Sequence, residues 1–78
     1  MRFYIAKITW YCEGEQGPLT DYLSIAGESF DDVMSQISNY YHDDELDAVE
    51  IKLINYERPL VRLPDEATYE AIKERGEI

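Results

Sequence analysis

Residues 40–47, YYHDDELD, bring together two tyrosines, the only histidine of the chain and four carboxylates. Side chains of these types can hold a metal ion, transfer protons or present charge to a partner. A calcium-binding EF-hand loop that began at Asp43 would need glycine at its sixth position, where the sequence has Ala48. Zinc sites need several cysteines or histidines, and this chain has one of each. We therefore expect no specific metal site and no cofactor, with weak magnesium or calcium binding near Asp43, Asp44 and Glu45 as an open alternative.

Catalysis by the same segment would need a partner from elsewhere in the chain. Cys12 and His42 would form a nucleophile and its base only if the fold brought them together. Cys12 instead continues an alternating apolar pattern, which is typical of a cysteine that packs as a small hydrophobic residue. Gly14 and Gly17 lie between two predicted strands rather than between a strand and a helix, so they predict no phosphate-binding loop. We expect a protein that is not an enzyme and has no catalytic residues.

The position of the acidic residues favours binding. Asp43, Asp44 and Glu45 directly follow a predicted helix, where the negative end of the helix dipole disfavours each carboxylate by about 0.3–1 kcal/mol. A sequence selected only for folding favours lysine, arginine or glycine there. Tyr40 and Tyr41 are neighbours on that helix, so their side chains diverge by about 100° and one of them must be partly exposed. Exposed tyrosine is typical of protein-binding surfaces.

The net charge of −10 is concentrated in one half of the chain. Residues 13–50 contain eleven acidic residues and no lysine or arginine, whereas residues 51–78 contain six acids and five bases. Such an electrostatic field repels phosphate groups, so we expect no direct binding to nucleic acid or to an anionic membrane. The same field attracts a basic protein surface.

The hydrophobic pattern predicts the elements that position these residues. Residues 2–12 alternate as a long strand, and residues 19–26 form a second strand after a loop with two glycines and a proline. This short connection predicts an antiparallel hairpin. Ser29 is the expected N-cap of the following helix. The side chains that recur at the helical period, and that we expect to face the sheet, are Phe30, Val33, Met34, Ile37 and Tyr41.

Two more strands and a closing helix are expected after the acidic segment. Residues 46–56 read as a third strand, residues 60–63 as a short fourth strand and residues 64–76 as the helix. The order β-β-α-β-β-α predicts an α+β fold. We expect an antiparallel β-sheet of three to four strands, with the main helix packed on one face and the first strand in the interior of the sheet.

Length and composition set the general class of protein. A chain of 78 residues forms one domain, residues 1–78, with one thin core and no deep cleft. No apolar run approaches the length of a membrane span, and the first twelve residues read as a strand rather than as a signal peptide. The lone cysteine excludes an internal disulfide and fits a cytoplasmic location.

We expect a small acidic protein-binding module whose carboxylate face docks on a basic protein surface. In its sharpest form the face imitates nucleic-acid phosphate and blocks a nuclease or another nucleic-acid-binding protein. The chain is similar to phage inhibitors of restriction or CRISPR nucleases in length and acidity only. The alternative is a non-enzymatic structural or assembly subunit that acts as a homodimer or larger homo-oligomer. The expected contact residues are Tyr40 or Tyr41 with Asp43, Asp44, Glu45 and Asp47, and secondarily Asp31, Asp32, Glu13, Glu15 and Glu28.

Overall fold

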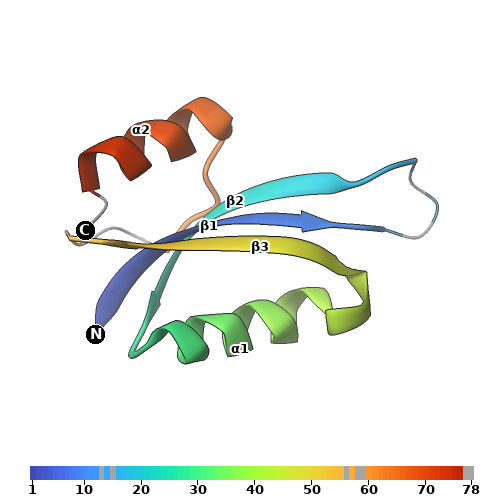
Figure 1. The fold of residues 1–78 in the computed structure, drawn as a ribbon, viewed down its shortest axis with the longest axis horizontal. Helices are drawn as coiled ribbons and strands as arrows, with labels where there is room; N and C mark the ends of the chain where they lie inside the picture. The colour runs from blue at the N-terminus through green and yellow to red at the C-terminus, as the bar shows by residue number, and fades with distance from the viewer. Residues whose placement is uncertain (13, 15, 56, 58–59, 77–78) are drawn as a thin grey trace.

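The computed structural model describes residues 1–12, 14, 16–55, 57 and 60–76, with the backbone alone at Asp43. Its strands are β1 (Arg2–Trp10), β2 (Leu19–Gly27) and β3 (Leu46–Ile54), and its helices are α1 (Phe30–Tyr41) and α2 (Glu66–Gly76). A 3₁₀ turn, η1 (Asp43–Glu45), connects α1 to β3. The elements form three layers, with the sheet between α1 on one face and α2 on the other (Figure 1).

β1 is the central strand of the sheet, and β2 and β3 pair with it on either side, both antiparallel. Tyr4, Ala6 and Ile8 of β1 belong to the core under α1, and all three are buried. Ile5 points to the opposite face and is buried in the core under α2. Because both faces of β1 are covered along this stretch, the strand needs apolar side chains on both sides. The predictions of an interior first strand and of a helix packed on one face of an antiparallel sheet are confirmed.

The α2 face of β1 changes from apolar to polar along the strand. Phe3 and Ile5 contribute to the core with Tyr69 and Ile72 of α2. Lys7 lies further along the same face and is half-buried. α2 covers the half of the sheet that contains the start of β1 and leaves the hairpin end uncovered (Figure 1). The change in side-chain polarity therefore follows the limit of the area that α2 covers.

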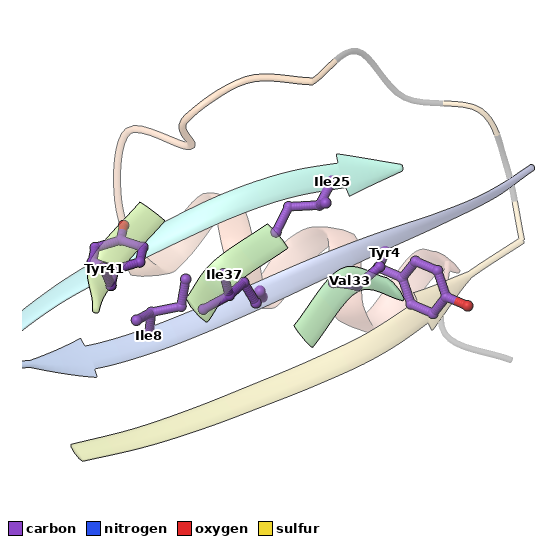
Figure 2. Close-up of a cluster of buried hydrophobic side chains, with 7 residues drawn as sticks. Tyr4, Ile8, Ile25, Val33, Ile37 and Tyr41 are labelled. Atoms are coloured by element: carbon purple, nitrogen blue, oxygen red, sulfur yellow. The ribbon is translucent and has the colours of Figure 1, made fainter. Parts of the chain in front are cut away.

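α1 begins at the predicted N-cap, and its buried face is as predicted except for one residue. The N–H of Asp32 donates a 3.2 Å hydrogen bond to the hydroxyl of the N-cap Ser29. Val33 and Ile37 are buried against the sheet (Figure 2). Phe30 is 52% exposed, so the prediction that it faces the sheet is wrong. A helical side chain leans towards the turn before it, and Phe30 is the first residue of α1, so no helical turn precedes it.

The prediction of a fourth strand over residues 60–63 is also wrong, and the element order is β-β-α-β-α. The segment runs beside β2 and forms a single bridge, between Leu23 and Arg62. Two backbone hydrogen bonds, of 2.8 and 2.7 Å, flank this bridge. The sheet therefore has three strands, and its β2 edge is covered over a short distance by an irregular segment.

The pairing along β2 stops because the chain turns into α2. Pro64 has no N–H that could extend the ladder. The carboxylate of the next residue, Asp65, caps α2 by accepting a 2.8 Å hydrogen bond from the N–H of Thr68. This bond and a second one from the Thr68 hydroxyl lower the pKa of Asp65. The expected closing helix is present, and Tyr69 and Ile72 bury its inner face.

Candidate functional site

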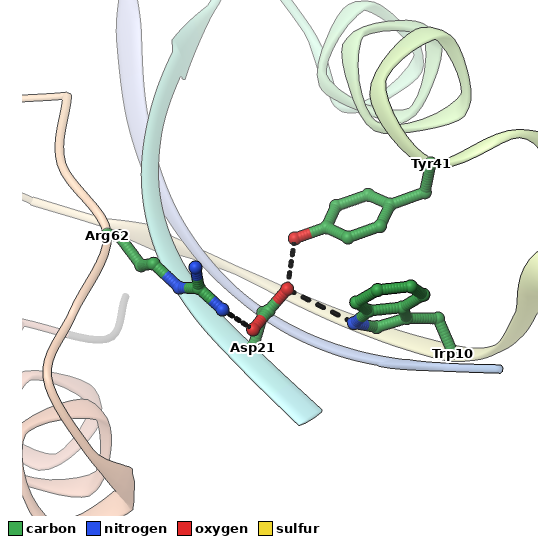
Figure 3. Close-up of polar contacts among 4 residues, drawn as sticks. All are labelled: Trp10, Asp21, Tyr41 and Arg62. Atoms are coloured by element: carbon green, nitrogen blue, oxygen red, sulfur yellow. Dashed lines mark hydrogen bonds and ion pairs between the residues drawn. The ribbon is translucent and has the colours of Figure 1, made fainter. Parts of the chain in front are cut away.

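A buried carboxylate, Asp21, lies where β1, β2, α1 and the segment after β3 meet. The residue is only 7% exposed. Its Oδ2 accepts hydrogen bonds from Nε1 of Trp10 at 3.1 Å and from the hydroxyl of Tyr41 at 2.7 Å. Its Oδ1 accepts a hydrogen bond from the guanidinium of Arg62, and the two side chains form an ion pair (Figure 3). Donors from three separate parts of the chain therefore satisfy one buried charge.

The electrostatics of this cluster keep its donors protonated. Burial raises the pKa of Tyr41 well above its ordinary value, and the hydrogen bond to Asp21 raises it further. The hydrogen bond to Asp21 likewise raises the pKa of Arg62. A buried carboxylate without donors carries a desolvation penalty of several kcal/mol. The hydrogen bonds and the ion pair of this cluster therefore offset the desolvation penalty of Asp21. They also fix α1 and the 60–62 segment relative to the sheet.

An apolar pocket opens beside this cluster, between β2, the last turns of α1 and the 60–62 segment. Its volume is about 380 Å³, and its apolar lining includes Leu23, Ile25, Tyr40, Leu60 and Val61. Tyr40 is 77% exposed, Leu60 64% and Val61 45%. Large apolar side chains that remain exposed around a concave surface are typical of binding sites.

The two adjacent tyrosines predicted as contact residues have different environments. Tyr41 is buried and hydrogen-bonded to Asp21, whereas Tyr40 stands on the surface. The ring of Tyr40 packs edge-on against that of Tyr41, with 4.9 Å between the ring centres. The expectation that one of the pair is exposed is confirmed. Tyr40, supported by the fixed ring beside it, is the tyrosine that a partner could contact.

The acidic segment follows Tyr41 as the turn η1. His42 ends α1 with a φ of 63° and a ψ of 132°, and its N–H donates a 3.2 Å hydrogen bond to the carbonyl of Ser38. The carbonyl of Glu45 accepts a 2.8 Å hydrogen bond from the N–H of Tyr11, which attaches η1 to the end of β1. Asp44 and Asp47 are exposed and Glu45 is half-buried. The side chain of Asp43 lies outside the described part of the structure.

The remaining candidate acids lie at the opposite end of α1 or outside the described residues. Asp31 and Asp32 are exposed in the first turn of α1, and Asp32 accepts a 2.9 Å hydrogen bond from the N–H of Glu28. α1 has 12 residues, so it separates these acids from η1 by about 18 Å. The structure therefore places the described acids at two ends of one helix rather than in a single cluster. Glu13 and Glu15 lie outside the described residues.

The basic residues are located mainly on the other side of the sheet. Strand alternation places Lys7 and Lys52 on the α2 face, opposite Tyr22 and Ile5 respectively. Lys73 and Arg75 belong to α2 itself. Two described bases are exceptions. The alternation of β1 places Arg2 on the α1 face, far from η1. Arg62 lines the pocket beside Tyr40, where its guanidinium pairs with Asp21. The described side chains of η1 are therefore acidic, and the described bases other than Arg2 and Arg62 lie behind the sheet.

Neither a metal cluster nor a membrane-spanning helix is found in the described ranges. No group of three histidine, cysteine, aspartate or glutamate side chains is placed there to hold a metal ion. No helix of the described chain is both long enough and apolar enough to cross a membrane.

Sequence reasoning missed the residues that form the pocket and its support. Asp21 did interrupt the apolar alternation of Leu19, Leu23 and Ile25, which is the signal of a charge directed into a core. Its main partner, Arg62, is 41 positions away in the chain, and no pattern in the sequence connects the two. Leu60 was assigned to a strand, so its exposure beside the pocket was not expected.

The fold and the site together define an α+β protein with a three-stranded antiparallel sheet between two helices and an apolar pocket at one sheet edge. Comparison of the chain with protein-family models, with curated proteins and with solved structures found no match.

Proposed function

We propose that this protein is a small acidic binding module that docks on a basic protein surface through the C-terminal end of α1. Tyr40 and the apolar pocket form the centre of the contact, and Asp44, Glu45 and Asp47 form its acidic rim. Asp43 belongs to the same rim by its position in η1. The proposed mechanism is occupation of the partner's basic surface, which excludes other ligands from it.

The observation that carries this proposal is the exposure of Tyr40 next to an apolar pocket and an acidic turn. Protein interfaces typically have a buried aromatic or aliphatic anchor surrounded by a polar rim. Tyr40 is 77% exposed, and the acidic turn η1 begins two residues beyond the end of α1 at Tyr41. The absence of lysine and arginine between residues 13 and 50 gives this rim one sign of charge. A rim of one sign favours fast association with a surface of the opposite sign.

The finer form of the proposal concerns the kind of partner. A surface that binds phosphate carries lysine and arginine, and the carboxylates near η1 would occupy it in place of nucleic acid. The partner is then a nuclease or another nucleic-acid-binding protein, and this chain is its inhibitor, as phage inhibitors of restriction and CRISPR nucleases are. The net charge of −10 supports this choice of partner.

The test is capture of binding proteins from a lysate of the source organism, followed by elution with rising salt. The acidic variant D44N/E45Q/D47N removes three charges near η1. The matched control E66Q/E70Q/E74Q removes three negative charges from α2, so the two variants have the same net charge. We expect the wild type and the α2 control to capture the same protein and the η1 variant to lose it. Equal capture by all three baits would contradict the proposal.

The nucleic-acid form of the proposal has its own readout. If a short DNA duplex or RNA elutes the captured protein from the wild-type bait at constant salt, the result supports imitation of nucleic-acid phosphate. A captured protein that resists elution by nucleic acid but is lost with Tyr40→Ala is a basic partner of another kind. The second result would retain the binding module and reject the nucleic-acid mimic.

A second candidate function is favoured by a different observation. β3 forms an edge of the sheet, and no described strand covers its outer side. This supports a structural or assembly subunit that acts as a homo-oligomer.

A further inference from the structure

The two edges of the sheet differ in how they are covered. Along β2, the N–H of Ser24 donates to the carbonyl of Val61 at 2.8 Å, and the N–H of Leu63 donates to the carbonyl of Tyr22 at 2.7 Å. β3 is nine residues long, and no described residue pairs with its outer side (Figure 1). A long unpaired edge is a template for another strand. The sheet can therefore be extended at β3.

The hydrogen bonds of β2 show which backbone groups of β3 point outward. In an antiparallel sheet the N–H and C=O of one residue point to the same neighbour, and successive residues alternate. Ser24 points away from β1, so Ile5, which lies opposite Ser24, points towards β3. Lys52 lies opposite Ile5 and points back to β1. The residues of β3 that direct their backbone groups outward are the alternate ones, Val49, Ile51 and Leu53.

The same three residues form an apolar stripe along the edge. Their side chains lie on the α1 face of the sheet, because they pair with Ile8, Ala6 and Tyr4 of β1. They pack against the core under α1 but remain only partly buried. A strand placed beside β3 would cover the apolar surface that α1 leaves exposed on these side chains.

The other face of β3 carries two opposite charges, Glu50 and Lys52. Glu50 accepts a 3.0 Å hydrogen bond from the hydroxyl of Tyr69 and forms a 3.4 Å ion pair with Lys73. Burial raises the pKa of Glu50, but these two hydrogen bonds outweigh it and hold the pKa below its ordinary value. At neutral pH the edge therefore has a negative charge at residue 50 and a positive charge at residue 52.

We propose that a second copy of this chain pairs with β3 as an antiparallel strand, with the two-fold axis at Ile51, so that two three-stranded sheets join into one. In this register Ile51 lies opposite Ile51, and Val49 lies opposite Leu53 of the other copy. Every outward N–H and C=O of these three residues then has a partner. Glu50 of each copy lies opposite Lys52 of the other copy, which gives two such pairs related by the axis. Apolar pairs lie on one face and ion pairs on the other.

Charge selects this register over its neighbours. An axis at Glu50 places two carboxylates directly opposite each other, and an axis at Lys52 does the same with two ammonium groups. Like charges in opposite positions destabilise strand pairing, whereas opposite charges stabilise it. β3 pairs in regular register with β1 from Ala48 to Ile54, and the register shifts before Ala48. An axis at Ile51 uses all of this regular stretch, whereas an axis at Val49 or Leu53 pairs only three residues of it. The register at Ile51 pairs the longest stretch without a repulsive contact.

This interface develops the second candidate function and lies apart from Tyr40 and its pocket, while Asp47 of the acidic rim is on β3, one residue before the paired stretch. The pocket beside Tyr40 lies at the β2 edge, and β1 separates that edge from β3. A dimer through β3 therefore leaves both pockets accessible and gives the assembly two acidic binding ends. Two linked sites on a partner with repeated basic surfaces bind more tightly than one site does.

The first test measures the mass of the full chain by light scattering and sedimentation over a range of concentrations up to millimolar. We expect a concentration-dependent species of twice 9.1 kDa. Lys52→Glu places carboxylates opposite each other in the dimer and retains the contacts of Glu50 with Tyr69 and Lys73. It should raise the dissociation constant about tenfold or more. A wild-type chain that remains a monomer throughout overturns the proposal.

Charge exchange distinguishes this register from a loss of folding. Glu50→Lys and Lys52→Glu should each dimerise poorly alone, and an equal mixture of the two variants should form a heterodimer because each charge again meets its opposite. Recovery in the mixture also shows that both variants are folded. If the mixture stays monomeric while circular dichroism shows both chains folded, the register at Ile51 is wrong.

Backbone exchange gives a readout that does not depend on charge. In the dimer the amide protons of Val49, Ile51 and Leu53 are hydrogen-bonded, so their exchange with deuterium should slow as the concentration of the wild-type chain rises. A dimer that forms equally in Lys52→Glu, with fast exchange at these amides, would use another surface and would contradict the proposal. Loss of dimerisation with capture through η1 intact would separate this interface from the binding site.

Discussion

The hydroxyl of Tyr41 donates a 2.7 Å hydrogen bond to the buried carboxylate of Asp21 and so joins the last turn of α1 to β2. The guanidinium of Arg62 contacts the other carboxylate oxygen. Both donors also line the pocket beside Tyr40. The shape of the proposed binding surface therefore depends on a charge that lies beneath it and is not itself accessible to a partner.

Removing the Tyr41 hydroxyl should destabilise the fold. Tyr41→Phe retains the ring but leaves Asp21 with one donor fewer, and a hydrogen bond to a charged group contributes about 1.5–3 kcal/mol. We expect the free energy of unfolding in urea to fall by about this amount. Tyr40→Phe is the matched control, because its ring is exposed, and it should leave the unfolding free energy unchanged. Equal effects from both substitutions would show that the Asp21 contact contributes nothing specific.

The burial of the Tyr41 hydroxyl, together with its hydrogen bond to Asp21, also predicts a loss of stability in alkali. The pKa of Tyr41 is raised in the folded protein above its ordinary value of 10.0, so the folded state binds the hydroxyl proton more tightly than the unfolded state does. The stabilisation is complete below the unfolded pKa and decreases as pH rises above about 10. The difference in unfolding free energy between wild type and Tyr41→Phe should shrink over that range. A difference that stays constant would show that Tyr41 titrates normally.

Ser24 should limit the stability of the α2 side of the core. Its hydroxyl is buried and has no hydrogen-bond partner among the described residues. An unsatisfied buried hydroxyl costs about 1–3 kcal/mol. We expect Ser24→Ala to raise the unfolding free energy by about 1 kcal/mol, since it removes the hydroxyl and little volume. A destabilised variant would indicate that the hydroxyl binds an ordered water in solution.

His42 should store backbone strain at the end of α1. Its φ of 63° and ψ of 132° fall in a region that side chains with a Cβ rarely adopt, at a cost of about 1–3 kcal/mol. His42→Gly should therefore raise the melting temperature, and His42→Ala should not, because alanine keeps the Cβ. Equal melting temperatures for the two variants would place the origin of any change in the imidazole rather than in the backbone.

The sequence predicts much of the fold because the local patterns agree with the final packing. The two-sided pattern of residues 2–12 indicates an interior strand, and Ser29 with the helical spacing after it indicates α1. The prediction of a fourth strand was based on the strand-like composition of residues 60–63. The strand does not form because Pro64 and the cap at Asp65 limit how far the segment can pair with β2. Whether such a segment extends the pairing or starts a helix depends on where the chain lies in the fold, and residue types alone do not show this.

The candidate site was predicted only in part. Their positions in the chain indicated Tyr40 and the acids of η1 as contact residues. Tyr40 lies outside the apolar helical pattern, and the acids directly follow the helix. The helical spacing also indicated that Tyr41 faces the sheet, and Tyr41 is buried. It did not indicate that the Tyr41 hydroxyl donates to Asp21, since that contact depends on the register of β2 with β1 and on the path of the chain at Arg62. The separation of Asp31 and Asp32 from η1 does follow from the predicted helix, because its 12 residues place the two groups of acids about 18 Å apart.

The placement of β1 has a consequence for how the protein is made. Of the three strands of the sheet, β1 is synthesised before β2 and β3, and it is also the middle strand. The hairpin with β2 can form early, but one edge of β1 remains unpaired until residues 46–54 are made, and its second face remains uncovered until α2 is made. During synthesis this domain thus carries an open strand edge and an uncovered Ile5, and its core under α2 is complete only after α2 has left the ribosome.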